Sequence, residues 1–152
     1  MPVRVQQDDF DVGAEIAALR AGNLGIGAIA SFVGTVREMN EGAGVAAMTL
    51  EHYPGMTERA LETICARARE RWNIVDALVV HRNGPLEPGD QIVLVVVASS
   101  HRGEAFAACE FIMDYLKTEA PFWKKERTAQ GERWVEARES DDEAAARWRE
   151  AR

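Results

Sequence analysis

The stretch Gln91–Ala98, QIVLVVVA, constrains the fold more than any other part of the chain. Every residue from Ile92 to Val97 is apolar, so a strand at this point has two hydrophobic faces and must be covered on both. A second β-rich stretch lies at 77–82, and the NGPLEPGD segment between the two has the glycines and prolines of a turn. The sequence therefore predicts a hairpin whose second strand is central in a sheet.

The other predicted elements mix helices and strands without a repeated strand–helix–strand unit. Hydrophobic spacing and capping residues predict helices at 12–20, 57–72 and 102–117 and a C-terminal helix opened by the capping box Ser140–Glu143. Further strands are predicted at 26–37, 45–52, 122–127 and 133–137. Because a short loop, 38–44, separates the first two of these strands, we expect them to pair antiparallel. The predicted fold class is α+β, with helices packed on a mostly antiparallel sheet.

Several residues have predicted local roles in these elements. Asp11 is expected to cap the first helix and Thr57 the second. Gly27 and Gly34 interrupt a strand and indicate a bulge or a close approach of another segment. The predicted inner stripe of the third helix consists of Phe106, Cys109, Met113 and Leu116.

Length and composition predict one globular domain spanning residues 1–152, with 47% hydrophobic and 28% charged residues. The net charge of -7 argues against a general binder of nucleic acid or of acidic membranes, because either would carry a broad basic face. Cys65 and Cys109 are far apart and fall on apolar helix faces, so we expect buried, reduced thiols and no zinc site. No signal-like or membrane-spanning pattern is present, and the expected location is cytoplasmic.

The lysines of the chain are clustered. Lys117, Lys124 and Lys125 are the only three, and the other fifteen of the 18 basic residues are arginines. Lys117 falls in the last turn of a predicted helix, where a cation also favours the helix dipole. Lys124 and Lys125 are adjacent on a predicted strand, so their side chains point to opposite faces and at most one of them can share a site with Lys117. The alternative is a solvated, partly aromatic hairpin.

A second candidate site is the segment Ser99–Arg102, where the central strand ends and a helix begins. The start of a helix presents unpaired N–H groups and partial positive charge, and a histidine and an arginine beside it could bind phosphate or carboxylate. Alternatively, Ser99 or Ser100 simply caps the helix and His101 is solvated; the residues alone leave both readings open. Arg37, at the end of an apolar strand, becomes a candidate only if it converges with the other basic residues.

Weaker signals are set aside. His52 and His81 lie at predicted strand ends, where a structural or exposed role is expected. Asp141 and Asp142 are explained as charges at the start of the C-terminal helix. Neither a dinucleotide fingerprint nor a nucleophile elbow is present, and no metal or cofactor is expected.

Four segments of the chain resemble the molybdopterin synthase large-subunit family, also called MoaE. They are LEHYPGM (50–56), SSHRGEAF (99–106), FIMDYLKTEAPFWKKE (111–126) and GERWVEARESD (131–141). The resemblance extends from about residue 25 to 148 and implies an α/β hammerhead fold with an antiparallel sheet. It implies a sulfurtransferase of molybdenum-cofactor biosynthesis, which converts cyclic pyranopterin monophosphate to molybdopterin by installing two sulfurs as a dithiolene.

The resemblance also implies protein partners. The sulfur comes from a small ubiquitin-like sulfur carrier, as a thiocarboxylate on its C-terminal Gly-Gly, and the carrier's tail threads into a pocket on the large subunit. Two large subunits form a central homodimer, with one small subunit at each end of the resulting heterotetramer. Trp134 and Trp148 could anchor such an interface, or they could belong to the core of the chain.

Matching motifs carry the family's site onto residues of this sequence. The basic substrate pocket falls on Arg37, His101, Arg102, Lys117 and Lys124. Neighbours in the same binding segments are Thr35, Val36, Lys125 and Glu126. Arg138 resembles the arginine that reaches a neighbouring subunit's pocket. We assign Lys117 and Lys124 as catalytic, because arginine binds anions but does not readily release a proton, whereas a lysine can.

Two other functions are compatible with the same residues. A non-catalytic module that binds the C-terminus of a ubiquitin-like protein would use the same cationic cleft, but only an enzyme would yield the dithiolene. A binder of single-stranded nucleic acid would use the aromatic and basic residues of FWKKER, 122–127, and its affinity would fall steeply with salt. The net charge of -7 counts against the second alternative.

Overall fold

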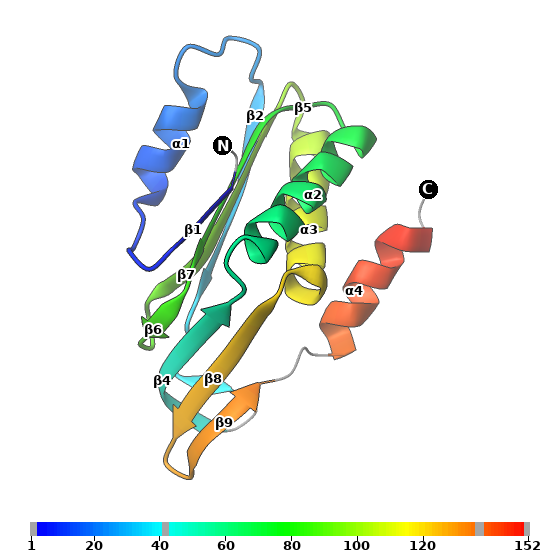
Figure 1. Ribbon diagram of the computed structural model, residues 1–152. Coiled ribbons are helices and arrows are strands. Elements are labelled where there is room, and N and C mark those ends of the chain that lie inside the picture. Colours follow the sequence, from blue (N-terminus) through cyan, green and yellow to red (C-terminus); the bar gives the residue numbers. More distant parts are fainter. Residues whose placement is uncertain (1–2, 41–42, 136–138, 151–152) are drawn as a thin grey trace.

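The computed structural model describes residues 3–40, 43–135 and 139–150 (Figure 1). The elements in chain order are β1 (Val3–Gln6), α1 (Val12–Arg20), β2 (Ala28–Thr35), β3 (Met39–Asn40), β4 (Ala43–His52), α2 (Met56–Arg71), β5 (Ile74–Arg82), β6 (Gly84–Leu86), β7 (Gln91–Ser99), α3 (Arg102–Glu119), β8 (Phe122–Thr128), β9 (Gly131–Val135) and α4 (Glu139–Glu150).

The first sheet has the strand order β1-β5-β7-β2, and β7 is antiparallel to both of its neighbours. This confirms the predicted hairpin of β5 and β7 and the central place of the apolar strand. Strand β1, which the sequence patterns did not predict, pairs parallel with β5. The remaining strand pairs are antiparallel, so the predicted α+β class with a mostly antiparallel sheet is confirmed.

Helices cover both faces of this sheet, as the two-sided hydrophobicity of β7 requires. Val93, Val95 and Val97 belong to the larger core, which also includes buried residues of α2 and α3. The alternate residues Leu94 and Val96 belong to a smaller core that packs against α1. Figure 1 shows α1 on one side of the sheet and α2 and α3 on the other, with α4 lying outside α3.

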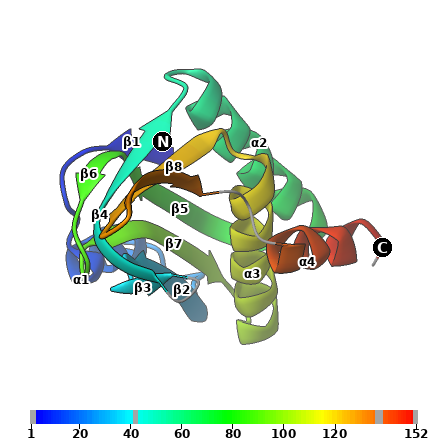
Figure 2. The ribbon, with the colours of Figure 1, turned by 90° about the horizontal axis from the view of Figure 1, so that it is seen from below.

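The second group of strands forms around β4, which pairs with β3, β6 and β8, while β9 pairs with β8 (Figure 2). The predicted pairing of the strands at 26–37 and 45–52 is therefore wrong, because β2 pairs with β7 and not with β4. The physical reason is that the apolar strand β7 needs a partner on each edge, and β2 hydrogen-bonds along its whole length. The short loop instead forms β3, which turns back onto β4.

Two helix predictions need correction. Phe106 is 66% exposed, whereas Cys109, Met113 and Leu116 are buried as predicted. The inner stripe of α3 begins one residue earlier, at Ala105. Helix α4 begins at Glu139, before the Ser140 that was predicted to cap it.

Local chemistry explains the other helix starts. Asp11 accepts a hydrogen bond from the N–H of Ala14 and caps α1, as predicted. Thr57 does not cap α2, because that helix starts from Gly55, whose φ of 84° suits glycine. The hydroxyl of Thr57 is buried instead, accepting from the N–H of Tyr53 and donating to the carbonyl of Pro121 at 2.9 Å. Thr57 thereby ties the start of α2 to the start of β8.

Cys65 and Cys109 are free and buried, as predicted. Burial raises the pKa of each thiol to about 11, so both stay protonated at neutral pH. Within the described part of the chain, none of the helices is both long enough and apolar enough to span a bilayer.

The two tryptophans considered for an interface differ. Trp148 packs inside the chain, with its ring 5.5 Å from that of Trp72, and its Nε1 donates to Asp114 at 2.6 Å. Trp134 is 55% exposed on β9. Trp148 is therefore a packing residue between α4 and the rest of the fold, and Trp134 remains the candidate for contact with another molecule.

Candidate active site

A cavity of about 330 Å³ lies where the two sheets meet the C-terminal end of α3. We call it the basic cavity because Arg37, Lys117 and Lys124 all line it. The described residues that line it are Phe32, Gly34, Thr35, Arg37, Met48, His81, Ile92, Val93, Leu116, Lys117, Ala120, Phe122, Lys124, Glu126, Val135 and Asp141. Arg37 thus converges with two of the clustered lysines, which was the condition set for it as a candidate.

Strand β8 sorts the adjacent lysines onto opposite faces. Phe122, Lys124 and Glu126 alternate into the basic cavity. The Lys125 ammonium lies on the other face, 2.8 Å from a carboxylate oxygen of Glu132 and 5.5 Å from the ring centroid of Trp134. The hydrogen bond to Glu132 raises the pKa of Lys125. The prediction that only one of the two lysines can share a site with Lys117 is confirmed.

Two of the described residues that line the basic cavity are carboxylates, Glu126 and Asp141. Glu126 is 1% exposed, and its Oε1 accepts from Nη2 of Arg133 at 3.1 Å. Asp141 reaches the cavity from the first turn of α4. It was explained from the sequence as a helix-start charge, so its place in the cavity lining was missed. A buried carboxylate such as Glu126 needs a cationic partner such as Arg133, because an unpaired ion in a low-dielectric interior is costly.

The end of β2 supplies Thr35 and Arg37 to the basic cavity. A register shift between Gly34 and Thr35 breaks the regular pairing with β7, and a Cβ on Gly34 would lie 2.8 Å from a methyl group of Val93. Val36 is buried, and its N–H donates to the carbonyl of Asp90 at 2.9 Å. Val36 therefore supports this corner of the fold through its backbone, while its two neighbours face the cavity.

Helix α3 separates the remaining candidates. Lys117 lies in its last turn, whereas His101 is its N-cap and Arg102 its first residue. At 1.5 Å of rise per residue, Arg102 and Lys117 are about 22 Å apart along the axis. One chain therefore does not bring them together, and His101 and Arg102 are exposed at the far end of the helix. Arg138, the remaining predicted residue, lies outside the described residues.

The serines before α3 are used by the fold. The Ser99 hydroxyl donates to the carbonyl of Asn73 at 2.6 Å, and the Ser100 hydroxyl donates to that of Gly25 at 3.3 Å. A Cβ on Gly27 would lie 2.1 Å from the Ser100 carbonyl oxygen, which confirms the predicted close approach. The interpretation that a serine caps α3 is therefore wrong, because His101 occupies the N-cap position.

His81 lines the basic cavity and was missed by the sequence reasoning. It is 4% exposed, and its ring stacks on Phe122 with centroids 3.7 Å apart. Burial lowers its pKa to about 3, and the charges of Lys124 and Lys117 add to this lowering. The imidazole is therefore neutral at physiological pH. The sequence did contain a signal for this position. Residues two apart on a strand point to the same face, so His81 is expected on the side of Val79, which belongs to the larger core.

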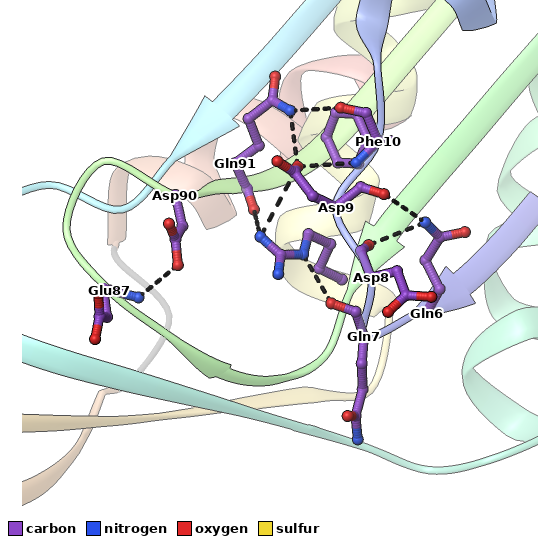
Figure 3. A network of polar contacts seen from close by, with 9 residues as sticks. Gln6, Gln7, Asp8, Asp9, Phe10, Glu87, Asp90 and Gln91 are labelled. Atoms are coloured by element: carbon purple, nitrogen blue, oxygen red, sulfur yellow. Dashed lines mark hydrogen bonds and ion pairs between the residues drawn. The ribbon is translucent and has the colours of Figure 1, made fainter.

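A polar network holds the strand ends beside the basic cavity (Figure 3). The Arg82 guanidinium donates through Nε to the carbonyl of Gln7 at 2.9 Å and through Nη1 to that of Gln91 at 3.1 Å. The Gln91 amide in turn donates to the Asp9 carboxylate and to the carbonyl of Phe10. The segment before α1 is thereby tied to the end of β5 and the start of β7.

The charges identified in the basic cavity come from amino-acid side chains and not from a metal-binding cluster. Across residues 3–40, 43–135 and 139–150, no cluster of three or more His, Cys, Asp or Glu is arranged to hold a metal ion. Among the described residues, three cationic side chains can bind anions here, beside apolar side chains that form the rest of the wall together with two carboxylates.

Comparison with known proteins gives consistent results. The family model described as MoaE protein matches residues 5–119. A molybdopterin synthase catalytic subunit from Ralstonia nicotianae is 70% identical over 96% of this chain and 83% of its own length. One from Pseudomonas aeruginosa is 59% identical over 99% of this chain and its full length. The solved structure of a molybdopterin biosynthesis MoaE protein from Burkholderia ambifaria superposes with a TM-score of 0.82 at 65% identity, covering 96% of each chain.

Proposed function

Because the chain belongs to the MoaE family, we propose that it is the catalytic subunit of a molybdopterin synthase, a sulfurtransferase of molybdenum-cofactor biosynthesis. The observation that carries the proposal to particular residues is the convergence of Arg37, Lys117 and Lys124 in one cavity. Both reactants are anions: the substrate, cyclic pyranopterin monophosphate, carries a phosphate, and the donor tail ends in a thiocarboxylate. Three cations in a chain of net charge -7 provide a local site for such groups.

The size and lining of the basic cavity suit this substrate. A volume of about 330 Å³ lies within the range of small-molecule sites. The apolar wall, which includes Phe32, Ile92 and Val135, can pack against a fused ring system. Arg37 can bond two phosphate oxygens at once through its planar guanidinium. One side of the cavity would therefore bind the phosphate, and the apolar side would pack against the rings.

The reaction assigns different work to the two lysines. The thiocarboxylate sulfur bonds to a substrate carbon that carries an oxygen substituent, and the carbon–oxygen bond breaks so that the oxygen leaves with the bonding electron pair. Water then attacks the acyl carbon, the acyl–sulfur bond breaks, the sulfur stays on the substrate, and the carrier leaves with an ordinary carboxylate. The tetrahedral centre at the acyl carbon bears a negative oxygen, which the Lys117 ammonium stabilises. Lys117 can also give or take a proton, because it is an amine. Lys124 holds the anions beside it, and a second carrier delivers the second sulfur.

His101 and Arg102 enter this proposal through a second copy of the chain. They are about 22 Å from Lys117 along α3, so they serve the same substrate only if they reach the cavity of a neighbouring subunit. Arg138 is assigned to that neighbour's cavity as well. The assembly is a homodimer with one small ubiquitin-like sulfur carrier bound to each subunit, forming a heterotetramer. The buried free thiols fit a reducing, cytoplasmic location.

The test is direct sulfur transfer. The purified chain is incubated with the thiocarboxylated carrier and cyclic pyranopterin monophosphate, and the dithiolene product is quantified. We expect two carriers to be converted to the carboxylate form for each molybdopterin formed, and no product from a carrier that begins with an ordinary carboxylate. A chain that binds the carrier tightly and yields no dithiolene would be a binding module, and the catalytic assignment would fail.

A further inference from the structure

The basic cavity has an unequal supply of hydrogen-bonding groups. Arg37, Lys117 and Lys124 only donate when charged. The carboxylates Glu126 and Asp141 only accept when ionised. Among the lining side chains that the structure describes, two neutral groups hydrogen-bond strongly, the Thr35 hydroxyl and the His81 imidazole. Cations and carboxylates respond mainly to charge, so a neutral acceptor is the group suited to recognising an uncharged part of a substrate.

The His81 ring is held in one orientation. Its Nδ1 lies 2.8 Å from the Arg82 carbonyl oxygen. A carbonyl only accepts, so Nδ1 carries the proton of the neutral ring and Nε2 has the free lone pair. One face of the ring stacks on Phe122, with planes 18° apart. The side chain of Arg82 is itself anchored to the carbonyls of Gln7 and Gln91, which fixes the peptide that orients the imidazole.

The acceptor atom retains some exposed surface. Within residues 3–40, 43–135 and 139–150, every fully buried side-chain nitrogen or oxygen has a hydrogen-bond partner. The hydrogen bond of His81 among these residues is the one that Nδ1 makes to Arg82. Nε2 is therefore not enclosed, although the residue as a whole is buried and lines the basic cavity.

The surroundings keep His81 an acceptor. Lys124 on β8, Lys117 on α3 and His52 on β4 each disfavour a second proton on the ring, and burial disfavours it most. Of the two carboxylates in the cavity lining, Glu126 is hydrogen-bonded to Arg133, and Asp141 lies at the start of α4. The ring therefore remains neutral beside three cations, where a charged histidine would only add a fourth.

We propose that His81 is a specificity-determining residue, whose Nε2 accepts a hydrogen bond from an N–H or O–H group of the substrate's heterocycle. This inference rests on the proposed function, since it concerns the same substrate in the same cavity. Arg37 and the lysines bind the phosphate and the donor tail through negative charge, which many other metabolites also carry. His81 recognises the ring, and a site built to bond a donor discriminates strongly against compounds that lack it, because its polar atom is then left unpaired.

Two substitutions separate this role from packing. His81→Phe keeps a ring against Phe122 and removes the acceptor, whereas His81→Gln restores an acceptor on a flexible side chain. We expect His81→Phe to raise the KM for cyclic pyranopterin monophosphate by about tenfold to a hundredfold, and His81→Gln to recover part of that loss. Affinity for inorganic phosphate, which lacks the ring, should stay within about twofold of the parent in both. A folded His81→Phe protein with the parent's KM would overturn the proposal, as would an equal loss of phosphate affinity.

Nitrogen NMR of the parent protein tests the same point without a substitution. In histidine-labelled protein, Nε2 of His81 should keep the shift of an unprotonated nitrogen between about pH 5 and about pH 8. It should move when cyclic pyranopterin monophosphate binds, and not when inorganic phosphate binds. If the parent makes dithiolene and this signal does not respond to the substrate, the His81 proposal alone is wrong. If the signal responds and no dithiolene forms, recognition stands and the proposed reaction fails.

Discussion

The two ends of helix α3 carry basic residues in different surroundings. At its start, His101 and Arg102 are exposed and line no described cavity. At its end, Lys117 is exposed as well, but it lines the basic cavity together with Lys124 and Arg37. The helix dipole alone would favour an anion at the start and a cation at the end. The proposed catalytic site nevertheless lies at the end, where an anion is held by side-chain charges and not by the helix.

This difference teaches that the convergence of charged side chains on one cavity matters more than the helix dipole. The dipole contributes roughly 0.3–1 kcal/mol at an exposed helix terminus and is screened by salt. Several side-chain charges that converge on one cavity add up in their attraction for an anion. The cavity end of α3 is therefore suited to chemistry, and its start is suited to contact with another molecule.

The largest expected effect comes from removing the cation at the cavity end of α3. Lys117→Met should lower kcat/KM for dithiolene formation by about a thousandfold or more, because anion stabilisation and the titratable amine are lost together. Lys125→Met is the matched control, since Lys125 faces away from the cavity toward Glu132. Equal losses in the two variants, measured by steady-state kinetics, would remove the distinction between the two faces of β8.

The second effect is a pH dependence of stability that originates at His81 in the basic cavity. The pKa of His81 is about 3 in the folded chain against 6.5 for an unperturbed histidine, so the unfolded chain takes up a proton first as the pH falls. His81 therefore favours the folded state fully above pH 6.5, and this contribution is lost progressively between pH 6.5 and about 3. The slope approaches about 1.4 kcal/mol of unfolding free energy per pH unit.

Denaturant unfolding at a series of pH values measures this slope. His81→Gln should flatten it, because glutamine does not titrate. His101→Gln, which changes the exposed histidine at the other end of α3, is the control and should keep the slope of the parent. A His81→Gln protein that loses stability toward acid as steeply as the parent would show that another group is responsible.

A smaller effect is expected at the start of α3. Arg102→Ala should raise the KM for the pterin substrate by about tenfold, because one charge-assisted contact from the neighbouring subunit is lost. The free energy of unfolding should change by no more than about 0.5 kcal/mol, since the side chain is exposed. Unchanged kinetics in a dimeric, folded Arg102→Ala protein would exclude this residue from the site. If the chain stays monomeric, Arg102 cannot reach the cavity of a neighbouring subunit, and the assignment fails as well.

Much of the fold could be predicted because the relevant patterns are local. The apolar run of β7 and the turn before it define the β5–β7 hairpin, and helical spacing locates α1, α2 and α3 within a few residues. The partner of β2 could not be predicted in this way, because strand pairing depends on which distant strand has an unsatisfied edge. Strand β1 is short and pairs with a strand more than seventy residues later, so no local signal identifies it.

The candidate site shows the same division. The alternation of a strand is enough to separate Lys124 from Lys125, and the family resemblance supplies Arg37 and Lys117. His81 lies outside the four family segments, and Asp141 has an adequate explanation as a helix-start charge. Both reach the cavity through the packing of β5 and α4. Arg102 and Lys117 are separated by the length of α3. They can serve one substrate only through a second copy of the chain, and the sequence of one chain does not show how two copies pack.

The central claim is that the amine of Lys117, and not merely its charge, is needed in the basic cavity. The direct measurement is single-turnover sulfur transfer by Lys117→Arg across a pH series, beside Lys124→Arg and Lys125→Arg. Arginine keeps the charge and removes the titratable amine. We predict that Lys117→Arg loses at least about a hundredfold in rate, that Lys124→Arg loses less, and that Lys125→Arg stays within about twofold of the parent. A Lys117→Arg protein that turns over like the parent at every pH would contradict the claim.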